Sequence, residues 1–101
     1  MAYRIHYDPE ARLDLRFHRR QQTWLIDEIE STLRHEPLRD TTNNGPMREN
    51  TLDAQRRLRR HPFRIYYDVH RQEGLVYVLA VCEKRASRVY RRDKEIQIDD
   101  D

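Results

Sequence analysis

The stretch that decides the fold runs from Phe63 to Tyr90 and reads FRIYYDVHRQEGLVYVLAVCEKRASRVY. In its first half every second residue from Phe63 to Val69 is apolar or aromatic, and this period of two predicts a strand with one buried face. Gly74 and the polar residues before it predict a short loop, so that the chain folds back as a hairpin. Residues 75–82 are apolar throughout, which suits a central strand covered on both faces.

The composition bounds the class of protein. With 101 residues, of which 37% are hydrophobic and 38% charged, the chain is expected to form one domain with a modest core. It has no run of about eighteen apolar residues, so we expect no membrane span. The first residues lack the apolar block of a signal peptide, and the single cysteine, Cys82, excludes an internal disulfide. We therefore expect a cytoplasmic protein with Cys82 as a small core residue.

Charge is distributed unevenly along the chain, although the net charge is only +2. Residues 1–46 carry seven basic and eight acidic groups, and residues 47–92 carry twelve basic and five acidic groups. Residues 93–101 carry one lysine and five acids. Five arginines fall within the nine positions from Arg56 to Arg64. Such an asymmetry predicts an anionic partner for the middle of the chain.

The residues before this basic region predict a strand and two helices. Residues 3–7 alternate and predict a short strand. Asp8 can cap a helix whose first turn holds Pro9, and Leu13 and Phe17, four residues apart, predict the apolar stripe of that helix. A second helix that ends before the proline at position 37 is predicted by apolar residues at helical spacing, namely Leu25, Ile26, Ile29 and Leu33.

The remaining segments complete an α+β fold. Residues 39–46 predict a loop, residues 54–60 predict a strand, and Pro62 marks the start of the next strand. We therefore expect an N-terminal strand, two helices in a helical hairpin, and a three-strand antiparallel meander that completes a four-stranded twisted sheet. A single domain would span residues 1–92, followed by an acidic tail at residues 93–101.

The ordered motifs resemble the RelE/ParE family, the toxins of bacterial toxin–antitoxin pairs. They are YRIHYDPEA at residues 3–11, FRIYYDV at residues 63–69 and VYVLAVCEKRASRVY at residues 76–90, with the Gly74 turn between the last two. The resemblance covers roughly residues 3–90. It implies a RelE-like fold, in agreement with the pattern above, and an antitoxin protein as partner.

The family has two branches, which imply different functions. The RelE-like branch cleaves messenger RNA on the ribosome, and the ParE-like branch inhibits DNA gyrase. Matched by position, the resemblance to the RelE-like branch implies catalytic roles for Arg64, Lys84 and Tyr90. The residues that it implies in RNA binding are Gln55, Arg57, Arg59, Arg85 and Arg88. Gln55 departs from the pattern, because the family has a lysine there.

The chemistry of RNA cleavage agrees with these residue types. Attack of a 2′-hydroxyl on the adjacent phosphate needs a proton acceptor, a proton donor and cations that stabilise the phosphorane. Arg64 keeps its proton and suits charge stabilisation, whereas Tyr90, with an ordinary pKa of about 10, could become a base if neighbouring cations lower its pKa. His61 lies near these residues in the sequence. We expect residues 64, 84 and 90 on one surface, and no metal or other cofactor.

The sequence therefore favours a metal-independent endoribonuclease, an mRNA interferase that inhibits translation. A gyrase inhibitor without catalysis and an inactive protein that only binds its antitoxin stay open as alternatives. Structural roles stay open too. Arg64 could pair with Asp68 or Glu83, Tyr90 could anchor the tail, and the acidic tail could fold over the cationic surface and weaken RNA binding.

Overall fold

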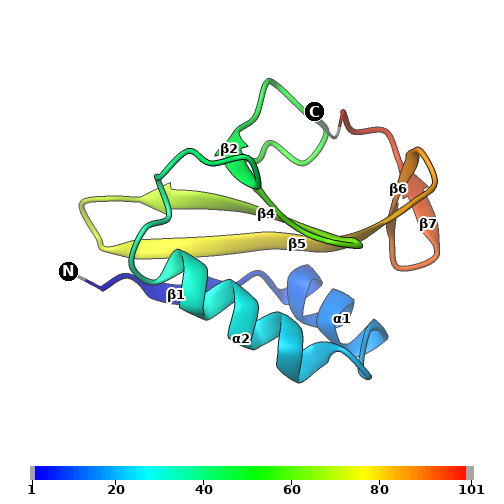
Figure 1. Ribbon diagram of the computed structural model, residues 1–101, viewed down its shortest axis with the longest axis horizontal. Coiled ribbons are helices and arrows are strands. Elements are labelled where there is room, and N and C mark those ends of the chain that lie inside the picture. The colour runs from blue at the N-terminus through cyan, green and yellow to red at the C-terminus, as the bar shows by residue number, and fades with distance from the viewer. Residues whose placement is uncertain (1, 100–101) are drawn as a thin grey trace.

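The computed structural model describes residues 2–99 and shows two helices packed on one face of a largely antiparallel sheet (Figure 1). The elements are β1 (Arg4–Tyr7), α1 (Pro9–Phe17), α2 (Gln22–Leu33), β2 (Asn44–Pro46), β3 (Arg56–Arg60), β4 (Phe63–His70), β5 (Leu75–Arg85), β6 (Arg88–Arg91) and β7 (Lys94–Ile96). The predicted α+β class is confirmed. Neither helix in residues 2–99 has the length and hydropathy of a membrane-crossing segment.

The sheet has further strands on both sides of the predicted meander. Its strand order is β2-β3-β4-β5-β6-β7, and β1 adds in parallel to β5. The four predicted strands are β1, β3, β4 and β5, and three short strands extend them among the described residues. The β4–β5 hairpin turns at Gly74, where a φ of 61° is accessible to glycine without steric cost. The segment that begins at Asp93 contributes β7, which pairs with β6.

A β-bulge explains why β5 is buried on both faces. Tyr66 of β4 pairs with Ala80, whereas the next residue, Tyr67, pairs with Val78, so that Leu79 is the extra residue on β5. The bulge shifts the alternation of side chains along β5. Val78 therefore packs in the core beneath the helices, and Ala80 packs on the opposite face.

Helix α1 begins as predicted but packs through a different stripe. The Asp8 carboxylate accepts a hydrogen bond from the Glu10 amide at 2.9 Å and caps the helix. The prediction that Leu13 and Phe17 form its buried stripe is wrong, because these residues are 39% and 42% exposed. The buried face of α1 consists of Ala11, Asp14 and Leu15. The small Ala11 lets the helix approach the sheet, and the Asp14 carboxylate has hydrogen-bond partners at the edge of β5.

Each face of the sheet has its own core. The first core lies beneath the helices and includes the fully buried α2 residues Leu25, Ile29 and Leu33, as predicted. The buried residues of the second core, on the opposite face, are Ala54, Tyr66, Ala80, Cys82 and Val89. We call these two surfaces the helix face and the open face. The open face carries the smaller core, so polar side chains can occupy the rest of it.

Candidate nucleic-acid interface

The alternation along β3 divides the arginine-rich segment between the two faces of the sheet. Arg56 pairs with Tyr67 and lies on the helix face, where its guanidinium binds the Asp40 carboxylate at 2.7 Å. Arg60 also lies on that face and binds Glu28 of α2 at 2.9 Å. The arginines at positions 57 and 59 alternate with these two and lie on the open face. Two members of the cluster are therefore ion-pair partners on the helix face, and the other two lie on the open face.

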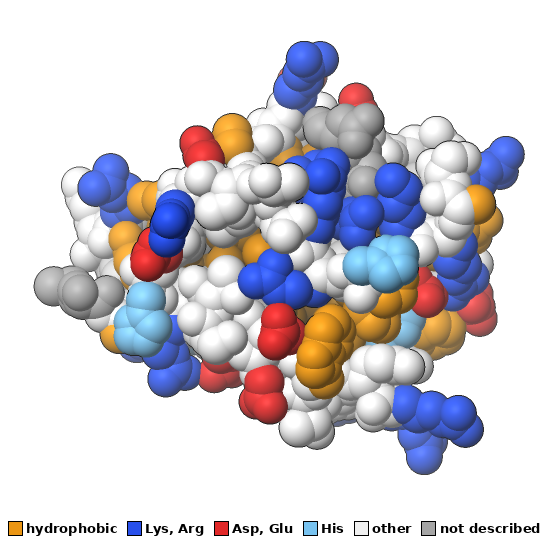
Figure 2. Space-filling model, in the orientation of Figure 1, with side chains coloured by type: hydrophobic (Ala, Val, Ile, Leu, Met, Phe, Trp, Pro, Cys, Tyr) orange, Lys and Arg blue, Asp and Glu red, His pale blue; other side chains and the backbone are white. Residues whose placement is uncertain are grey.

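Four cations share the open face, and we call this group the cationic face. Arg57 pairs with Tyr66, a residue of the open-face core, and Arg59 pairs with Arg64. Lys84 lies two residues beyond Cys82, the partner of Arg64 on β5, and so points to the same side. Figure 2 shows Lys and Arg side chains gathered above the β4–β5 hairpin, on the side of β6. The members of the cationic face are Arg57, Arg59, Arg64 and Lys84.

The cationic face is held in place by burial and by backbone hydrogen bonds. Arg57 and Arg64 are only 8% and 6% exposed, which is rare for arginine. The Arg64 guanidinium also donates to the Phe63 carbonyl at 3.0 Å. The Lys84 amide donates to the Pro62 carbonyl at 2.8 Å, which fixes the end of β5 against the start of β4. Side chains restrained in this way lose little rotamer entropy when they bind an anion.

Gln55 lies at the border of the cationic face and has a structural role there. The side-chain oxygen of Gln55 accepts a hydrogen bond from the backbone amide of Val69 at 2.9 Å, and the backbone amide of Gln55 donates to the Asp68 carboxylate at 2.8 Å. These two bonds connect the start of β3 to the end of β4. The Asp68 carboxylate, a possible partner of Arg64 in the sequence analysis, thus holds the start of β3 through Gln55. A role of Gln55 in RNA binding stays a prediction.

Tyr90 lies on the opposite face from Arg64 and Lys84, so the expectation of one common surface is wrong for this residue. Lys84 pairs with Val89, which packs in the open-face core, whereas Tyr90 pairs with Glu83. Neighbouring residues on a strand point to opposite faces. The phenol of Tyr90 therefore lies on the helix face. Its catalytic role stays a prediction that the geometry supports less than those of Arg64 and Lys84.

Two other predicted RNA-binding residues, Arg85 and Arg88, lie on the same face of the sheet as Tyr90. They pair with each other across the β5–β6 turn. Arg85 lies over the Tyr90 ring at 4.6 Å and binds Glu83 at 3.0 Å, while Arg88 binds Glu95 of β7 at 3.1 Å. The predicted site residues thus form two groups, one on each face of the sheet, and only the cationic face holds cations from three neighbouring strands.

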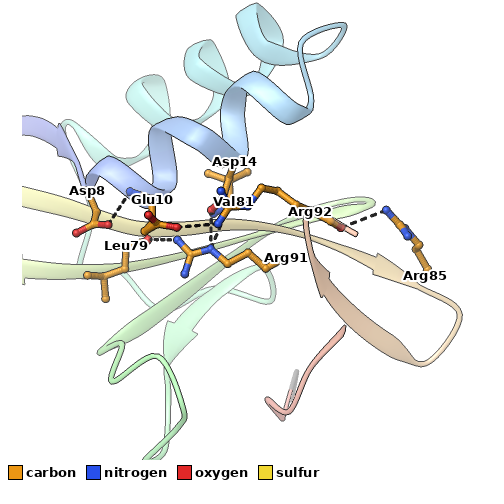
Figure 3. A network of polar contacts seen from close by, with 8 residues as sticks. All are labelled: Asp8, Glu10, Asp14, Leu79, Val81, Arg85, Arg91 and Arg92. Carbon is orange, nitrogen blue, oxygen red and sulfur yellow. Dashed lines mark hydrogen bonds and ion pairs between the residues drawn. The ribbon is translucent and has the colours of Figure 1, made fainter. Parts of the chain in front are cut away.

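A buried carboxylate that the sequence analysis missed fixes the strand on which Tyr90 lies (Figure 3). Asp14 has no exposed surface, and its carboxylate accepts from the Val81 amide at 2.9 Å and from the Arg91 guanidinium at 3.1 Å. Arg92 adds an ion pair to Asp14 at 3.3 Å. Arg91 also donates to the Leu79 carbonyl at 2.9 Å. We call this network the Asp14 clip.

The Asp14 clip completes one edge of the sheet. β1 pairs with residues 75–78 of β5, and β6 pairs with residues 83–85 on the same side of that strand. Between them the backbone groups of Leu79 and Val81 find their hydrogen-bond partners in side chains, because no strand lies there. A signal for Asp14 exists in the sequence, since its spacing from Ala11 and Leu15 places it on one helical stripe with them.

Several aromatic side chains cluster on the helix face around Phe63, the first residue of β4. The His18 ring lies 5.0 Å from the rings of both Phe17 and Phe63, and Trp24 lies 6.2 Å from Phe63. Burial lowers the pKa of His18, which favours its neutral form. His61 is exposed in the turn between β3 and β4. Across residues 2–99, His, Cys, Asp and Glu side chains form no group that could hold a metal ion.

Comparison with known proteins supports the fold assignment. No protein-family model matches the chain, and no curated protein matches it in sequence. A solved structure that matches is the crystal structure of the toxin–antitoxin complex RelBE2 from Mycobacterium tuberculosis, with a TM-score of 0.69 and 25% identity over 83% of this chain and 93% of that chain. The chain has a RelE-type fold. The predicted resemblance is therefore confirmed.

Proposed function

We propose that this RelE-type protein is the toxin of a toxin–antitoxin pair and that its cationic face binds the phosphate backbone of messenger RNA. The observation that carries the proposal is the position of Arg57, Arg59, Arg64 and Lys84 on one face of three adjacent strands. The similar structure is itself a complex of a toxin with its antitoxin, which supports an antitoxin partner here.

The geometry of the cationic face suits a polyanion. Neighbouring strands lie about 4.8 Å apart, and side chains two residues apart on one strand lie about 7 Å apart on the same face. The face thus arranges four positive charges in a fixed grid, in which Arg59 and Lys84 are partly exposed and Arg57 and Arg64 lie below the surface. Because Arg57 and Arg64 are largely buried, water screens their charges less than those of exposed side chains, which strengthens their attraction for phosphate.

We further propose that binding leads to cleavage without a metal. The RNA 2′-oxygen would attack the adjacent phosphorus, the bond from phosphorus to the 5′-oxygen would break, and a 2′,3′-cyclic phosphate and a 5′-hydroxyl would form. The 2′-hydroxyl proton passes to an acceptor, and the leaving 5′-oxygen takes up a proton. Arg64 and Lys84 would stabilise the negative charge on the phosphorane. Tyr90 is the predicted proton acceptor, and its place on the helix face makes this the least supported step.

Controlled expression followed by mapping of RNA ends tests the proposal. We expect the wild-type chain to generate new 5′ ends in messenger RNA, and the variants Arg64→Gln and Lys84→Gln to lose most of this cleavage. The matched control is Arg71→Gln, which removes the same charge from an exposed residue of the β4–β5 turn. Far-ultraviolet circular dichroism and urea denaturation would show that the variants remain folded.

The same experiment separates cleavage from the alternatives. Intact transcripts together with DNA damage and filamentation would exclude the nuclease and support inhibition of gyrase. Growth without any defect would exclude a toxin. Tyr90→Phe gives a further test, since loss of a general base typically lowers the rate by about 10²- to 10⁴-fold. Unchanged cleavage by Tyr90→Phe would remove Tyr90 from the site.

A further inference from the structure

The last residue of β7 and the residues that follow it cross the open face of the sheet. Ile96 and Ile98 pack against the open-face core, which contains Tyr66, Cys82 and Val89. The hydroxyl of Thr51 donates a hydrogen bond to the Gln97 carbonyl at 3.0 Å, so backbone as well as side chains hold the segment. We call residues 96–99 the crossing segment.

The crossing segment lies next to the cationic face. The core against which it packs contains direct cross-strand partners of the cations: Tyr66 pairs with Arg57, Cys82 with Arg64, and Val89 with Lys84. Asp99 follows Ile98 directly, and the sequence continues with two further aspartates. A packed apolar anchor therefore lies beside a surface that carries four positive charges, and in the sequence it is followed directly by acidic residues.

We propose that the crossing segment inhibits this site in the free protein, because the Asp99 carboxylate competes with RNA phosphates for the cationic face. The inference rests on the proposed function of that face. Carboxylate and phosphate oxygens are alternative partners for the same guanidinium and ammonium groups. A tethered competitor acts at a high effective concentration without any new partner. RNA binds only the fraction of molecules whose cationic face is open, so its apparent affinity falls by that fraction.

The anchor and the charge of the segment are separable features. Replacing Asp99 by asparagine removes the carboxylate of the segment and leaves Ile96 and Ile98 unchanged. Replacing Ile98 by serine keeps every charge but weakens the apolar anchor in the open-face core. If inhibition requires both the apolar anchor and the negative charge, each of the two variants should bind RNA more tightly than wild type. A simple effect of net charge predicts tighter binding only in the first.

The test is fluorescence anisotropy with a short labelled single-stranded RNA at low and at high salt. The variants are Asp99→Asn and Ile98→Ser. The matched control is Asp27→Asn, which makes the same charge change at an exposed residue of α2. We expect both test variants to bind RNA about tenfold more tightly than wild type at low salt, and the difference to shrink as salt rises. The control should stay within about twofold of wild type.

Two outcomes would overturn the inference. Equal affinities of wild type and both test variants would show that the segment does not compete, and equal gains in Asp99→Asn and in the control would show a net-charge effect. A parallel measurement on Arg57→Gln/Arg59→Gln keeps the proposed function separate. If this variant loses RNA binding while the test variants match wild type, the inhibition is contradicted and the proposed site is supported. If it binds RNA as wild type does, both the proposed site and the inhibition are contradicted.

Discussion

The two faces of the sheet differ in what covers them. Within residues 2–99, the helix face buries thirteen residues in one cluster beneath α1 and α2, whereas the open face buries five and is crossed by an extended segment. The larger core supplies most of the apolar burial and therefore most of the stability. The open face can consequently hold Arg57, Arg59 and Arg64 at positions that a larger core would need for apolar side chains.

The same contrast appears within one strand. On β3, Arg56 and Arg60 point to the helix face and form ion pairs with Asp40 and Glu28. Arg57 and Arg59 point to the open face. A cluster of arginines in a sequence thus does not define one surface. The period of the strand divides it between the two faces of the sheet, and the following predictions are designed to break or to sharpen that division.

The largest effect on stability is expected at the Asp14 clip. Asp14→Asn removes the charge that compensates Arg91 in a buried position, and breaking a buried pair typically costs about 3–5 kcal/mol in the free energy of unfolding. Urea denaturation measures the loss. The control is Glu10→Gln, which removes an exposed partner of Arg92 and should cost less than about 1 kcal/mol. Equal losses in the two variants would show that the clip does not hold β6 to the fold.

A smaller effect, and a direct comparison of the two cores, comes from isoleucine truncation. Ile29→Ala on the helix face should lower the free energy of unfolding by about 2–5 kcal/mol, because Ile29 is fully buried. Ile96→Ala on the open face should cost less than half as much, since Ile96 is only partly buried. Chemical denaturation of both variants under one set of conditions provides the measurement. Similar losses would contradict the view that the helix face dominates stability.

The smallest effect concerns Cys82, which tests whether the open face of β5 is covered. Burial raises the pKa of this thiol to about 12. The neutral thiol therefore contributes to stability below its ordinary pKa of 9.0, and the contribution is lost as the pH rises towards about 12. At pH 8 we expect iodoacetamide to alkylate Cys82 only in urea-unfolded protein, as followed by mass spectrometry. Rapid alkylation of the folded protein would show that this face opens readily.

Local patterns predicted much of the fold correctly. The period of two in β4 identified which residues pack beneath the helices, because Phe63, Ile65, Tyr67 and Val69 all lie in the helix-face core. The capping residue Asp8 was identified because its hydrogen bond lies within one turn of the chain. Strand β2 was missed, since three residues of loop-like sequence gain their strand geometry only by pairing with β3.

The errors arose where the answer depends on distant contacts. Residues 13 and 17 and residues 11 and 15 both have helical spacing, and only the edge of β5 selects the second pair. The position of Tyr90 depends on the length of the β5–β6 turn. Two residues, Ala86 and Ser87, separate the paired Arg85 and Arg88. A three-residue turn that included Arg88 would pair Lys84 with Tyr90 and bring them to the same face. A family resemblance does not fix the length of this turn.

The most direct test of the central claim is an RNA-binding comparison between two double variants that remove equal charge from opposite faces. Arg57→Gln/Arg59→Gln acts on the open face, and Arg85→Gln/Arg88→Gln acts on the helix face. Fluorescence anisotropy with one labelled single-stranded RNA should show that the first variant loses about 100-fold in affinity and has a weaker salt dependence, while the second stays within about threefold of wild type. Equal losses in the two variants would mean that RNA senses only net charge, and would contradict a binding site on the cationic face.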